Sequence, residues 1–358
     1  MGRQPRPCGP QRTAATACYS TCMQFPIRAA CAMLLVCWCG LAQARAPAKA
    51  ATTPPPDAAQ REFAAEVERD GGPPAATVLA TLAGAKRQQS ILDAISKPAE
   101  ATRTWAQYRP IFLGQQRIDA GVTFYREHRE LLDRIGAEQG VAPEILVAIM
   151  GVETGYGKIT GKYRVLDALA TLAFHYPPRA RFFRGELKQL FLLGDAHLAY
   201  PLDELRGSYA GAMGWGQFMP TSIAQWARDE DGDGRIDLWN SLPDISASIA
   251  NYFVAHGWQA GAPVAIRAQP AATATPPPEP GLDPVYTVQQ LEAWGYAPTE
   301  HVDAATPATL LALEGERGVE YWLIFGNFRA ITRYNKSPMY ALAVYQLAQA
   351  IAAGAAVP

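Results

Sequence analysis

Apolar residues recur with helical spacing through most of this chain. In the stretch GVTFYREHRELLDRIGAEQG (121–140), Phe124, Leu131, Leu132 and Ile135 fall on one helical face. Gly140 can end that helix, and Pro143 suits the first turn of the next. We expect further helices in four segments: YRVLDALATLAF (163–174), RARFFRGELKQLFLL (179–193), LPDISASIANYFVAHGW (242–258) and SPMYALAVYQLAQAIAA (337–353).

The pattern changes between about 262 and 331. The first part of this segment is Pro-rich and lacks helical periodicity, and ATLLALEGERGVEYWLIFGNFRAI (308–331) carries short apolar runs broken by Gly. We interpret 262–331 as a Pro-rich segment with a small inserted β domain. The expected fold class is therefore α+β, mainly α, with a helical N-terminal region (61–140), a core region (141–261) and a C-terminal helix (332–358) returning to that core.

The first 44 residues have the order of a secretory signal peptide. They contain four Arg and no acidic residue, and they end in the apolar run AACAMLLVCWCGLA followed by small residues. We expect cleavage after Ala44 or Ala46 and export to the periplasm, with Met23 as an alternative start and an uncleaved anchor as the alternative to cleavage. Residues 45–60 are rich in Ala and Pro and predict a linker.

All six cysteines lie in this leader, so we expect the mature chain to contain no thiol, which excludes disulfides, cysteine zinc sites and cysteine nucleophiles. Large side chains, Val36 and Trp38, precede Cys37 and Cys39, and we therefore expect no lipid anchor. The chain has 32 basic and 33 acidic side chains, and without the leader its net charge is −5. This balance does not favour nucleic acid as a partner.

Glu153 follows a run that is apolar on every face, Ile145 to Met150, near the end of the helix predicted from Pro143. Apolar surroundings disfavour a charged carboxylate and raise its pKa, so such a group can act as a general acid. The alternative is a helix-end Glu that faces water or pairs with Lys158 or Arg164. The chain has no H-E-x-x-H, G-x-S-x-G, P-loop or dinucleotide motif.

Two further stretches carry polar and aromatic groups in a pattern typical of ligand sites. GSYAGAMGWGQFMP (207–220) interleaves four glycines with Ser208, Tyr209, Trp215 and Gln217, which lets backbone approach a sugar while aromatic and amide groups face it. The alternative is a tight turn buried between helices. TRYNKSPMY (332–340) places polar and aromatic side chains before the last helix, where they could also be a helix cap.

The stretch DEDGDGRIDLWNSLPD (229–244) has the spacing of an EF-hand calcium loop. Side chains at positions 1, 3, 5 and 9 and a backbone carbonyl at position 7 would be the ligands: Asp229, Asp231, Asp233, Asp237 and the Arg235 carbonyl. Position 12 should be Glu but is Asn240, and Asp244 can supply the carboxylate if the loop is enlarged. A solvated acidic loop is the alternative.

Together these stretches resemble the lytic murein transglycosylase B family (glycoside hydrolase family 103), over roughly residues 100–358. The resemblance implies a lysozyme-like core, cleavage of the β-1,4 bond between N-acetylmuramic acid and N-acetylglucosamine in peptidoglycan, and a structural calcium ion without an organic cofactor. The partner would be the glycan strand, besides other cell-wall enzymes, and we expect a monomer.

The resemblance also assigns roles to individual residues. Glu153 matches the family's one essential carboxylate. Ser208 and Gln217 match family positions that bond the substrate or orient the acid, and Tyr334, Asn335 and Tyr340 match a cluster that faces the substrate cleft. Tyr156 and Tyr209 are weaker candidates for sugar contacts. The calcium loop matches with one extra residue before Asp244.

One acid suffices for this family's reaction, whereas ordinary glycosidases need two carboxylates. Glu153 would protonate the glycosidic oxygen and then take the proton from the muramic C6 hydroxyl as it attacks C1, which gives a 1,6-anhydro sugar. A lysozyme-type hydrolase and a non-catalytic peptidoglycan-binding protein are the alternatives.

Overall fold

The computed structural model describes residues 57–96, 103–195, 197–279 and 281–357, all within one structural unit, Thr53–Pro358. The predicted signal peptide lies outside the described residues, as does most of the predicted linker. Helix α1 (Ala58–Arg69) begins inside that linker, because Asp57 and Gln60 form a capping box that satisfies free backbone N–H groups. Residues 58–60 are therefore helical, which corrects the predicted end of the linker.

The N-terminal part is helical as far as residue 139. The helices after α1 are α2 (Ala75–Ala83), α3 (Gln89–Ile95), α4 (Trp105–Phe112), α5 (Gln115–Glu127) and α6 (Arg129–Gln139). The prediction of a single helix over 121–140 was wrong. The backbone of His128 (φ −117°, ψ 19°) departs from α-helical dihedral angles and separates α5 from α6. No Gly or Pro marks this break. Gly140 ends α6 in the left-handed region (φ 68°), as predicted.

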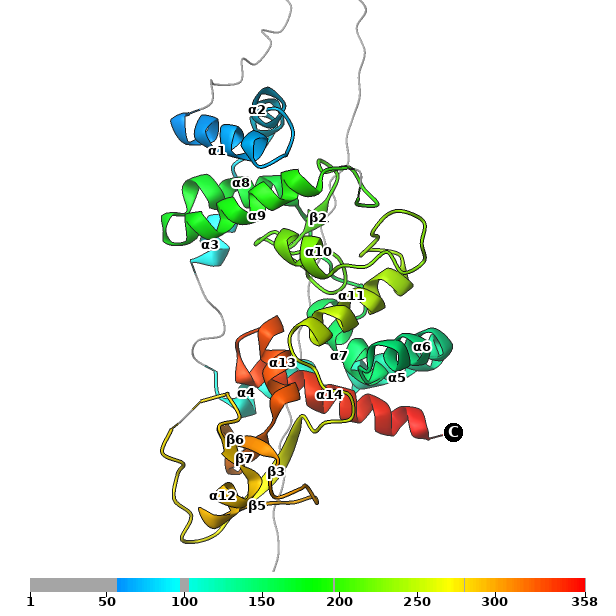
Figure 1. Ribbon diagram of the computed structural model, residues 1–358, viewed down its shortest axis with the longest axis vertical. Helices are drawn as coiled ribbons and strands as arrows, with labels where there is room; N and C mark the ends of the chain where they lie inside the picture. Colours follow the sequence, from blue (N-terminus) through cyan, green and yellow to red (C-terminus); the bar gives the residue numbers. More distant parts are fainter. Residues whose placement is uncertain (1–56, 97–102, 196, 280, 358) are drawn as a thin grey trace, which may run out of the picture. The chain divides into compact units, whose positions relative to one another are not determined.

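Helix α7 (Pro143–Thr154) is the central element of the core (Figure 1). Its residues Ile145 to Gly151 are all buried, as expected for a helix that is apolar on every face. The other core elements are β1 (Tyr163–Arg164), α8 (Val165–His175), a 3₁₀ turn η1 (Pro177–Arg179), α9 (Ala180–Leu193), β2 (Arg206–Gly207), α10 (Pro220–Trp226) and α11 (Leu242–Ala255). Strands β1 and β2 pair antiparallel.

The predicted β insertion is confirmed as a five-stranded sheet with the order β4-β6-β7-β3-β5, in which neighbouring strands are antiparallel. It has a small core of its own that includes Ile266, Leu291 and Leu323. Its elements are β3 (Ala265–Pro270), β4 (Tyr286–Thr287), α12 (Val288–Ala293), β5 (Tyr296–Pro298), β6 (Pro307–Gly315) and β7 (Gly318–Ile324).

Helices α13 (Gly326–Tyr334) and α14 (Pro338–Ala356) return the chain to the helical core, where α14 packs against α7 and α5. Among the described residues, α14 alone is by itself long and apolar enough to cross a membrane, and 44% of its most apolar stretch is buried in the protein. Helices α6 and α7 pass that test only as a pair, bent by 111°. The fold is α+β and mainly α, as predicted.

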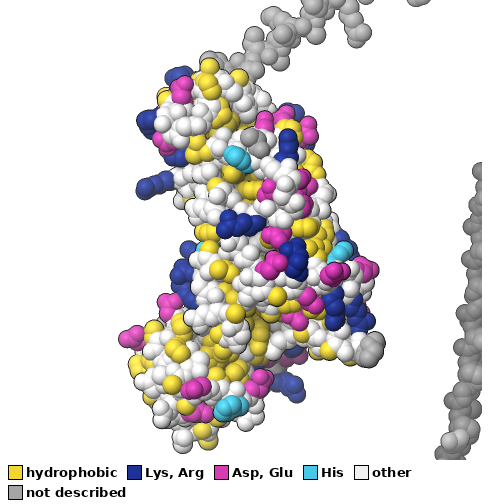
Figure 2. Space-filling model, turned by 45° about the vertical axis from the view of Figure 1, so that its right-hand side comes forward, with side chains coloured by type: hydrophobic (Ala, Val, Ile, Leu, Met, Phe, Trp, Pro, Cys, Tyr) yellow, Lys and Arg dark blue, Asp and Glu magenta, His cyan; other side chains and the backbone are white. Residues whose placement is uncertain are grey.

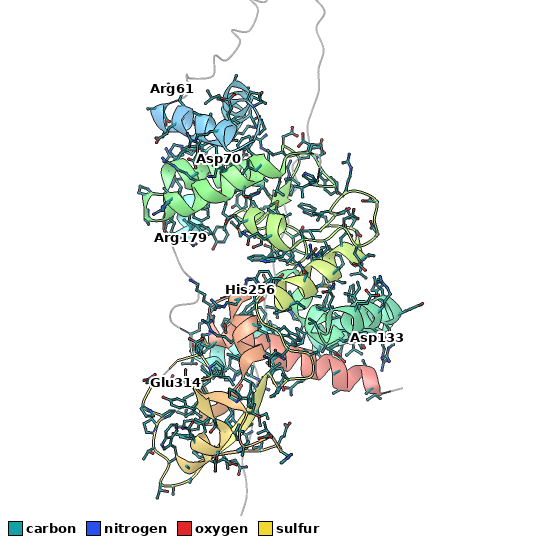
Figure 3. The ribbon with its side chains drawn as sticks, viewed as in Figure 1. Arg61, Asp70, Asp133, Arg179, His256 and Glu314 are labelled. Carbon is teal, nitrogen blue, oxygen red and sulfur yellow. The ribbon has the colours of Figure 1, made fainter. Side chains whose placement is uncertain are left out.

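Polar contacts connect the first helices to the core. Lys188 of α9 donates to Glu66 (2.7 Å) and Asp70 (2.8 Å), and Asp70 is labelled beside α1 in Figure 3. The buried Asp167 of α8 accepts from the backbone N–H of Lys86 (2.9 Å). On the face shown in Figure 2, basic and acidic side chains are interspersed, in keeping with the nearly balanced charge of the chain.

Candidate active site

Glu153 lies in the last turn of the buried helix α7 and is itself half-buried. The helix ends at Thr154 because Gly155 adopts a left-handed conformation (φ 60°), followed by Tyr156 at φ 62°. From α14, the hydroxyl of Tyr340 donates a hydrogen bond of 2.6 Å to Oε1 of Glu153. The helix that carries the acid and the last helix of the chain therefore meet at this carboxylate.

Two phenols adjoin the acid, the buried Tyr340 and the partly buried Tyr334. Burial, and next the negative charge of Glu153, raise the pKa of both Tyr340 and Tyr334 well above the ordinary value for tyrosine. Both hydroxyls therefore keep their protons at neutral pH and serve as donors. Tyr334 donates to the backbone oxygen of Gly216 (2.8 Å), which fixes the Gly-rich loop beside the acid.

The Gly-rich loop, residues 207–219, lies directly against the chain that follows α7. A Cβ at Gly161 would approach the backbone of Gly207 to 2.0 Å, so these two segments touch only because Gly161 has no side chain. The Thr154 hydroxyl donates to the backbone oxygen of Trp215 (3.2 Å). Residues next to the acid in sequence are therefore held by this loop.

Ser208 and Gln217 both organise the loop. The Ser208 hydroxyl oxygen accepts from the backbone N–H of Ala212 (3.0 Å). Gln217 has φ 53°, a strained value for a side chain with a Cβ, and its amide nitrogen donates to the carbonyls of Thr160 (3.1 Å) and Gly214 (2.9 Å). Gln217 thus ties the Gly-rich loop to the segment after α7.

The other predicted substrate-binding residues differ in their surroundings. Asn335 accepts from the backbone N–H of Ser337 (3.0 Å) just before α14, and Tyr209 is 41% exposed. Tyr156 was a weak candidate for a sugar contact, but its ring is 9% exposed and its hydroxyl donates to the backbone oxygen of Arg117 (2.8 Å). Its ring also packs on Phe124, so Tyr156 belongs to the core, which corrects that prediction.

Sequence reasoning missed Tyr252 of α11. Its ring lies 4.7 Å from that of Tyr334, its hydroxyl donates to the backbone oxygen of Arg333 (2.7 Å), and burial raises its pKa to about 12. Tyr252 therefore supports the ring that adjoins Glu153. Its position on a predicted helix gave no signal of this role, because the contact joins residues far apart in the chain.

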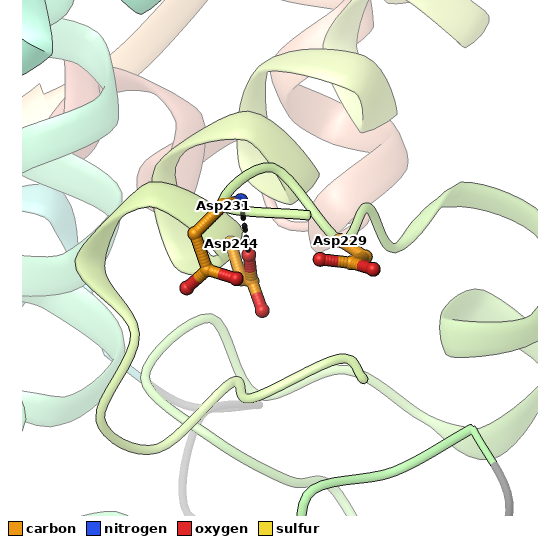
Figure 4. Close-up of side chains that lie close together, drawn as sticks. All are labelled: Asp229, Asp231 and Asp244. Atoms are coloured by element: carbon orange, nitrogen blue, oxygen red, sulfur yellow. Dashed lines mark hydrogen bonds between the residues drawn. The ribbon is translucent and has the colours of Figure 1, made fainter. Parts of the chain in front are cut away.

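The acidic loop brings three carboxylates together (Figure 4). Asp229, Asp231 and Asp244 each offer an oxygen within 4.8 Å of the others. Asp244 is buried, and its oxygens accept from the backbone N–H groups of Glu230 (2.8 Å) and Asp237 (2.8 Å). Burial raises the pKa of Asp244, and the backbone hydrogen bonds partly oppose that rise.

The remaining predicted ligands of this loop lie outside that group of three. Asp233 accepts from the backbone N–H of Arg235 (2.8 Å), and Asp237 accepts from those of Trp239 and Asn240 (2.9 Å each). Within the described part of the chain, no basic side chain forms an ion pair with the three clustered carboxylates. Three hard oxygen donors without a counter-charge fit a calcium ion.

The chain is similar to known proteins in sequence and in structure. The family described as Transglycosylase SLT domain matches residues 56–349. Membrane-bound lytic murein transglycosylase B of Escherichia coli (strain K12) is 43% identical over 280 residues, which cover 76% of each chain. The solved structure of Escherichia coli lytic transglycosylase Slt35 in complex with calcium is similar with a TM-score of 0.75 and 40% identity, covering 84% of this chain and 94% of the other.

A third match is Pseudomonas aeruginosa SltB3 in complex with NAG-anhNAM-pentapeptide. It has a TM-score of 0.72 and 32% identity, and the match covers 83% of this chain and 79% of the other.

Proposed function

The chain belongs to the lytic murein transglycosylase family and is an enzyme that acts on peptidoglycan, and from this membership we propose that Glu153 is the single acid and base of the reaction. The observation that carries the proposal is the 2.6 Å hydrogen bond from Tyr340 to Oε1 of Glu153. This bond holds the carboxyl group of Glu153 in a fixed orientation.

In the first step, protonated Glu153 gives its proton to the glycosidic oxygen as the bond to C1 of the muramic residue breaks. The leaving sugar departs with a hydroxyl group, and the 2-acetamido group of the substrate stabilises the positive C1. Glu153 is then a carboxylate, which the Tyr340 hydroxyl stabilises because hydrogen bonds to charged acceptors are the stronger ones.

In the second step, the muramic C6 hydroxyl attacks C1 and gives its proton to Glu153. A C6–O–C1 bond forms, the product ends in a 1,6-anhydro sugar, and no water is consumed. Ser208, Gln217, Tyr334, Asn335 and Tyr209 position the glycan strand or the loop beside the acid.

The test is mass spectrometry of the muropeptides released from purified peptidoglycan, with the Glu153→Gln variant run in parallel. Products that are one water lighter at the muramic residue, and absent with the variant, are expected. Reducing-end products would instead indicate a lysozyme-type hydrolase, in which water replaces the C6 hydroxyl. Release of anhydro products by the variant would contradict the role of Glu153.

We also propose that the acidic loop binds a structural calcium ion. Asp229, Asp231 and Asp244 would hold it, with Asp233, Asp237 and the Arg235 carbonyl as the further predicted ligands. The ion would supply a positive charge that offsets the repulsion among these groups. The calcium complex of Slt35 supports this assignment.

The proposed location is the periplasm. In the first 44 residues a basic region is followed by an apolar region, and this order supports export. The substrate of the family also lies outside the inner membrane. The glycan strand is the proposed binding partner, in keeping with the peptidoglycan fragment bound to SltB3.

A further inference from the structure

A cavity lies beside the end of helix α7. It has a volume of about 340 Å³. Gly157 and Thr160 form one wall, just after the helix that carries Glu153. Three aromatic side chains also line it: Tyr200, Trp215, which packs directly on Gly157, and Trp239.

These three rings are half-buried, so each keeps part of its surface open to a ligand. Tyr200 and Trp239 meet edge to face with ring centroids 5.5 Å apart, which forms a corner of two aromatic walls. Aromatic walls with a few convergent polar groups are typical of small-molecule sites. Flat apolar faces of this kind cover the C–H patches of a pyranose ring.

Polar groups at the rim suit a ligand that carries hydroxyl and amide groups. Asn240, Glu204 and Arg206 line the cavity and are exposed. They provide an amide, an acceptor and a donor, and their charges offset each other, so the cavity favours a largely neutral polar ligand. An N-acetylhexosamine has this combination of C–H faces, hydroxyls and one acetamido group.

The walls are held in place by hydrogen bonds before any ligand arrives. The Trp239 indole N–H donates to the backbone oxygen of Arg206 (3.2 Å), and its backbone N–H donates to Asp237 (2.9 Å). The backbone N–H of Trp215 donates to the oxygen of Leu238 (2.9 Å), next to Trp239. Such preorganisation lowers the entropic cost of binding.

The cavity is also tied to the catalytic acid. Trp215 accepts from Thr154, the neighbour of Glu153 in sequence, and the Thr160 carbonyl accepts from Gln217. A sugar bound against Trp215 would therefore contact the same loop that adjoins the acid.

We propose that this cavity, formed around Tyr200, Trp215 and Trp239, is an additional binding subsite for one N-acetylhexosamine residue of the glycan strand, outside the residues that act on the broken bond. This rests on the proposed function, because it assumes that a glycan strand passes Glu153. The subsite would increase the affinity for longer strands without taking part in the chemistry.

The test measures binding separately from cleavage. Titration calorimetry would follow a tetrasaccharide of alternating N-acetylglucosamine and N-acetylmuramic acid on the full-length Glu153→Gln protein, with and without Trp239→Ala. We expect Trp239→Ala to raise Kd about tenfold, and Trp239→Phe, which keeps an aromatic ring, to restore most of the affinity. In the active enzyme, Trp239→Ala should raise KM far more than it lowers kcat.

Trp294→Ala is the matched control. Trp294 is likewise half-buried and meets a tyrosine edge to face, Tyr286 at 4.9 Å, but it belongs to the β insertion. It should leave Kd unchanged. If Trp239→Ala lowers the melting temperature strongly, the exposed Asn240→Ala serves instead, with an expected rise in Kd of about threefold.

Unchanged Kd in a folded Trp239→Ala or Asn240→Ala protein would overturn the subsite and leave the role of Glu153 intact. A different measurement tests the role of Glu153. If the Glu153→Gln variant released anhydro products from peptidoglycan, that role would be wrong.

Discussion

Tyr340 and Glu153 lie 187 residues apart in the chain and are joined by a hydrogen bond of 2.6 Å. The bond links α14, the last helix, to α7, the helix that carries the acid. Because the phenol keeps its proton at neutral pH, it acts as a permanent donor to the carboxyl group. The C-terminal helix thus directly contacts the carboxyl group that we propose to be the acid and base of the reaction.

Tyr340→Phe should lower kcat about 10- to 100-fold, because a hydrogen bond to a charged group contributes about 1.5–3 kcal/mol. KM should change little, since the lost donor acts on the acid. Initial rates on purified peptidoglycan strands would measure both constants. Tyr345→Phe, also on α14, is the control and should retain wild-type kcat. A Tyr340→Phe enzyme with wild-type kcat would contradict the role assigned to this bond.

Local sequence patterns predicted the helix that carries Glu153, whereas Tyr340 was singled out only by the resemblance to a known family. The unbroken apolar run before Glu153 indicated a buried helix, and Pro143 and Gly140 marked its start and the end of the previous helix, because caps and burial depend on nearby residues. The contact with Tyr340 depends on how α14 packs, which spacing along the chain does not encode. Tyr156 shows the opposite error, since an aromatic residue near the acid proved to be part of the core.

In the acidic loop, too, local sequence predicted some features, and others depend on packing. Alternate Asp residues predicted a cation site, and the structure gathers three carboxylates there. Asp244 lies beyond the standard length of such a loop, so the sequence did not decide whether it is a ligand of the cation. Its burial beside Asp231 results from the packing of α11. Asp233 and Asp237 also fit the spacing but lie outside this group of three.

Calcium should stabilise the folded protein. A ligand that binds only the folded state raises the free energy of unfolding by mass action, by about 2.7 kcal/mol at a concentration 100 times Kd. Adding a chelator should therefore lower the melting temperature, and Asp231→Asn should abolish that shift. Differential scanning calorimetry measures both.

Glu314→Gln, at an acidic residue of strand β6 labelled in Figure 3, is the control for the cation effect. It should leave the shift on chelation intact. An equal shift in wild type and Asp231→Asn would contradict the proposed ligands, and no shift in either would contradict the ion itself.

The burial of Glu186 leads us to expect a specific pH dependence of the free energy of unfolding. This buried residue of α9 accepts from the backbone N–H (3.0 Å) and hydroxyl (2.8 Å) of Thr221 at the start of α10. Burial raises its pKa above the ordinary value of 4.5, and the Thr221 bonds partly oppose the rise. Between the unfolded and folded pKa values the folded state binds more protons, so stability falls as pH rises through this range.

The free energy of unfolding of wild type relative to Glu186→Gln should therefore be largest below pH 4.5 and decline as pH rises above it. Urea denaturation at a series of pH values gives the difference directly. The exposed Glu314→Gln should show no such decline. A difference that grows with pH would mean that the folded protein lowers the pKa of Glu186.

Gly161→Ala tests the close approach of the Gly-rich loop to the segment after α7. Gly161 has φ 106°, and a Cβ there would lie 2.0 Å from the Gly207 backbone. Gly71 has a similar φ of 92° but open space around it, so Gly71→Ala should cost only the conformational penalty of about 1–2 kcal/mol. Gly161→Ala should cost about 1–3 kcal/mol more from overpacking.

The Gly161 substitution should also lower kcat at temperatures where the variant stays folded, because displacement of the loop shifts Trp215 and with it the support of Thr154 beside the acid. Urea denaturation gives the stabilities of both variants, and initial rates at 25 °C give their activities. Equal losses of stability in the two variants, with full activity in both, would show that the loop can move away without consequence for Glu153.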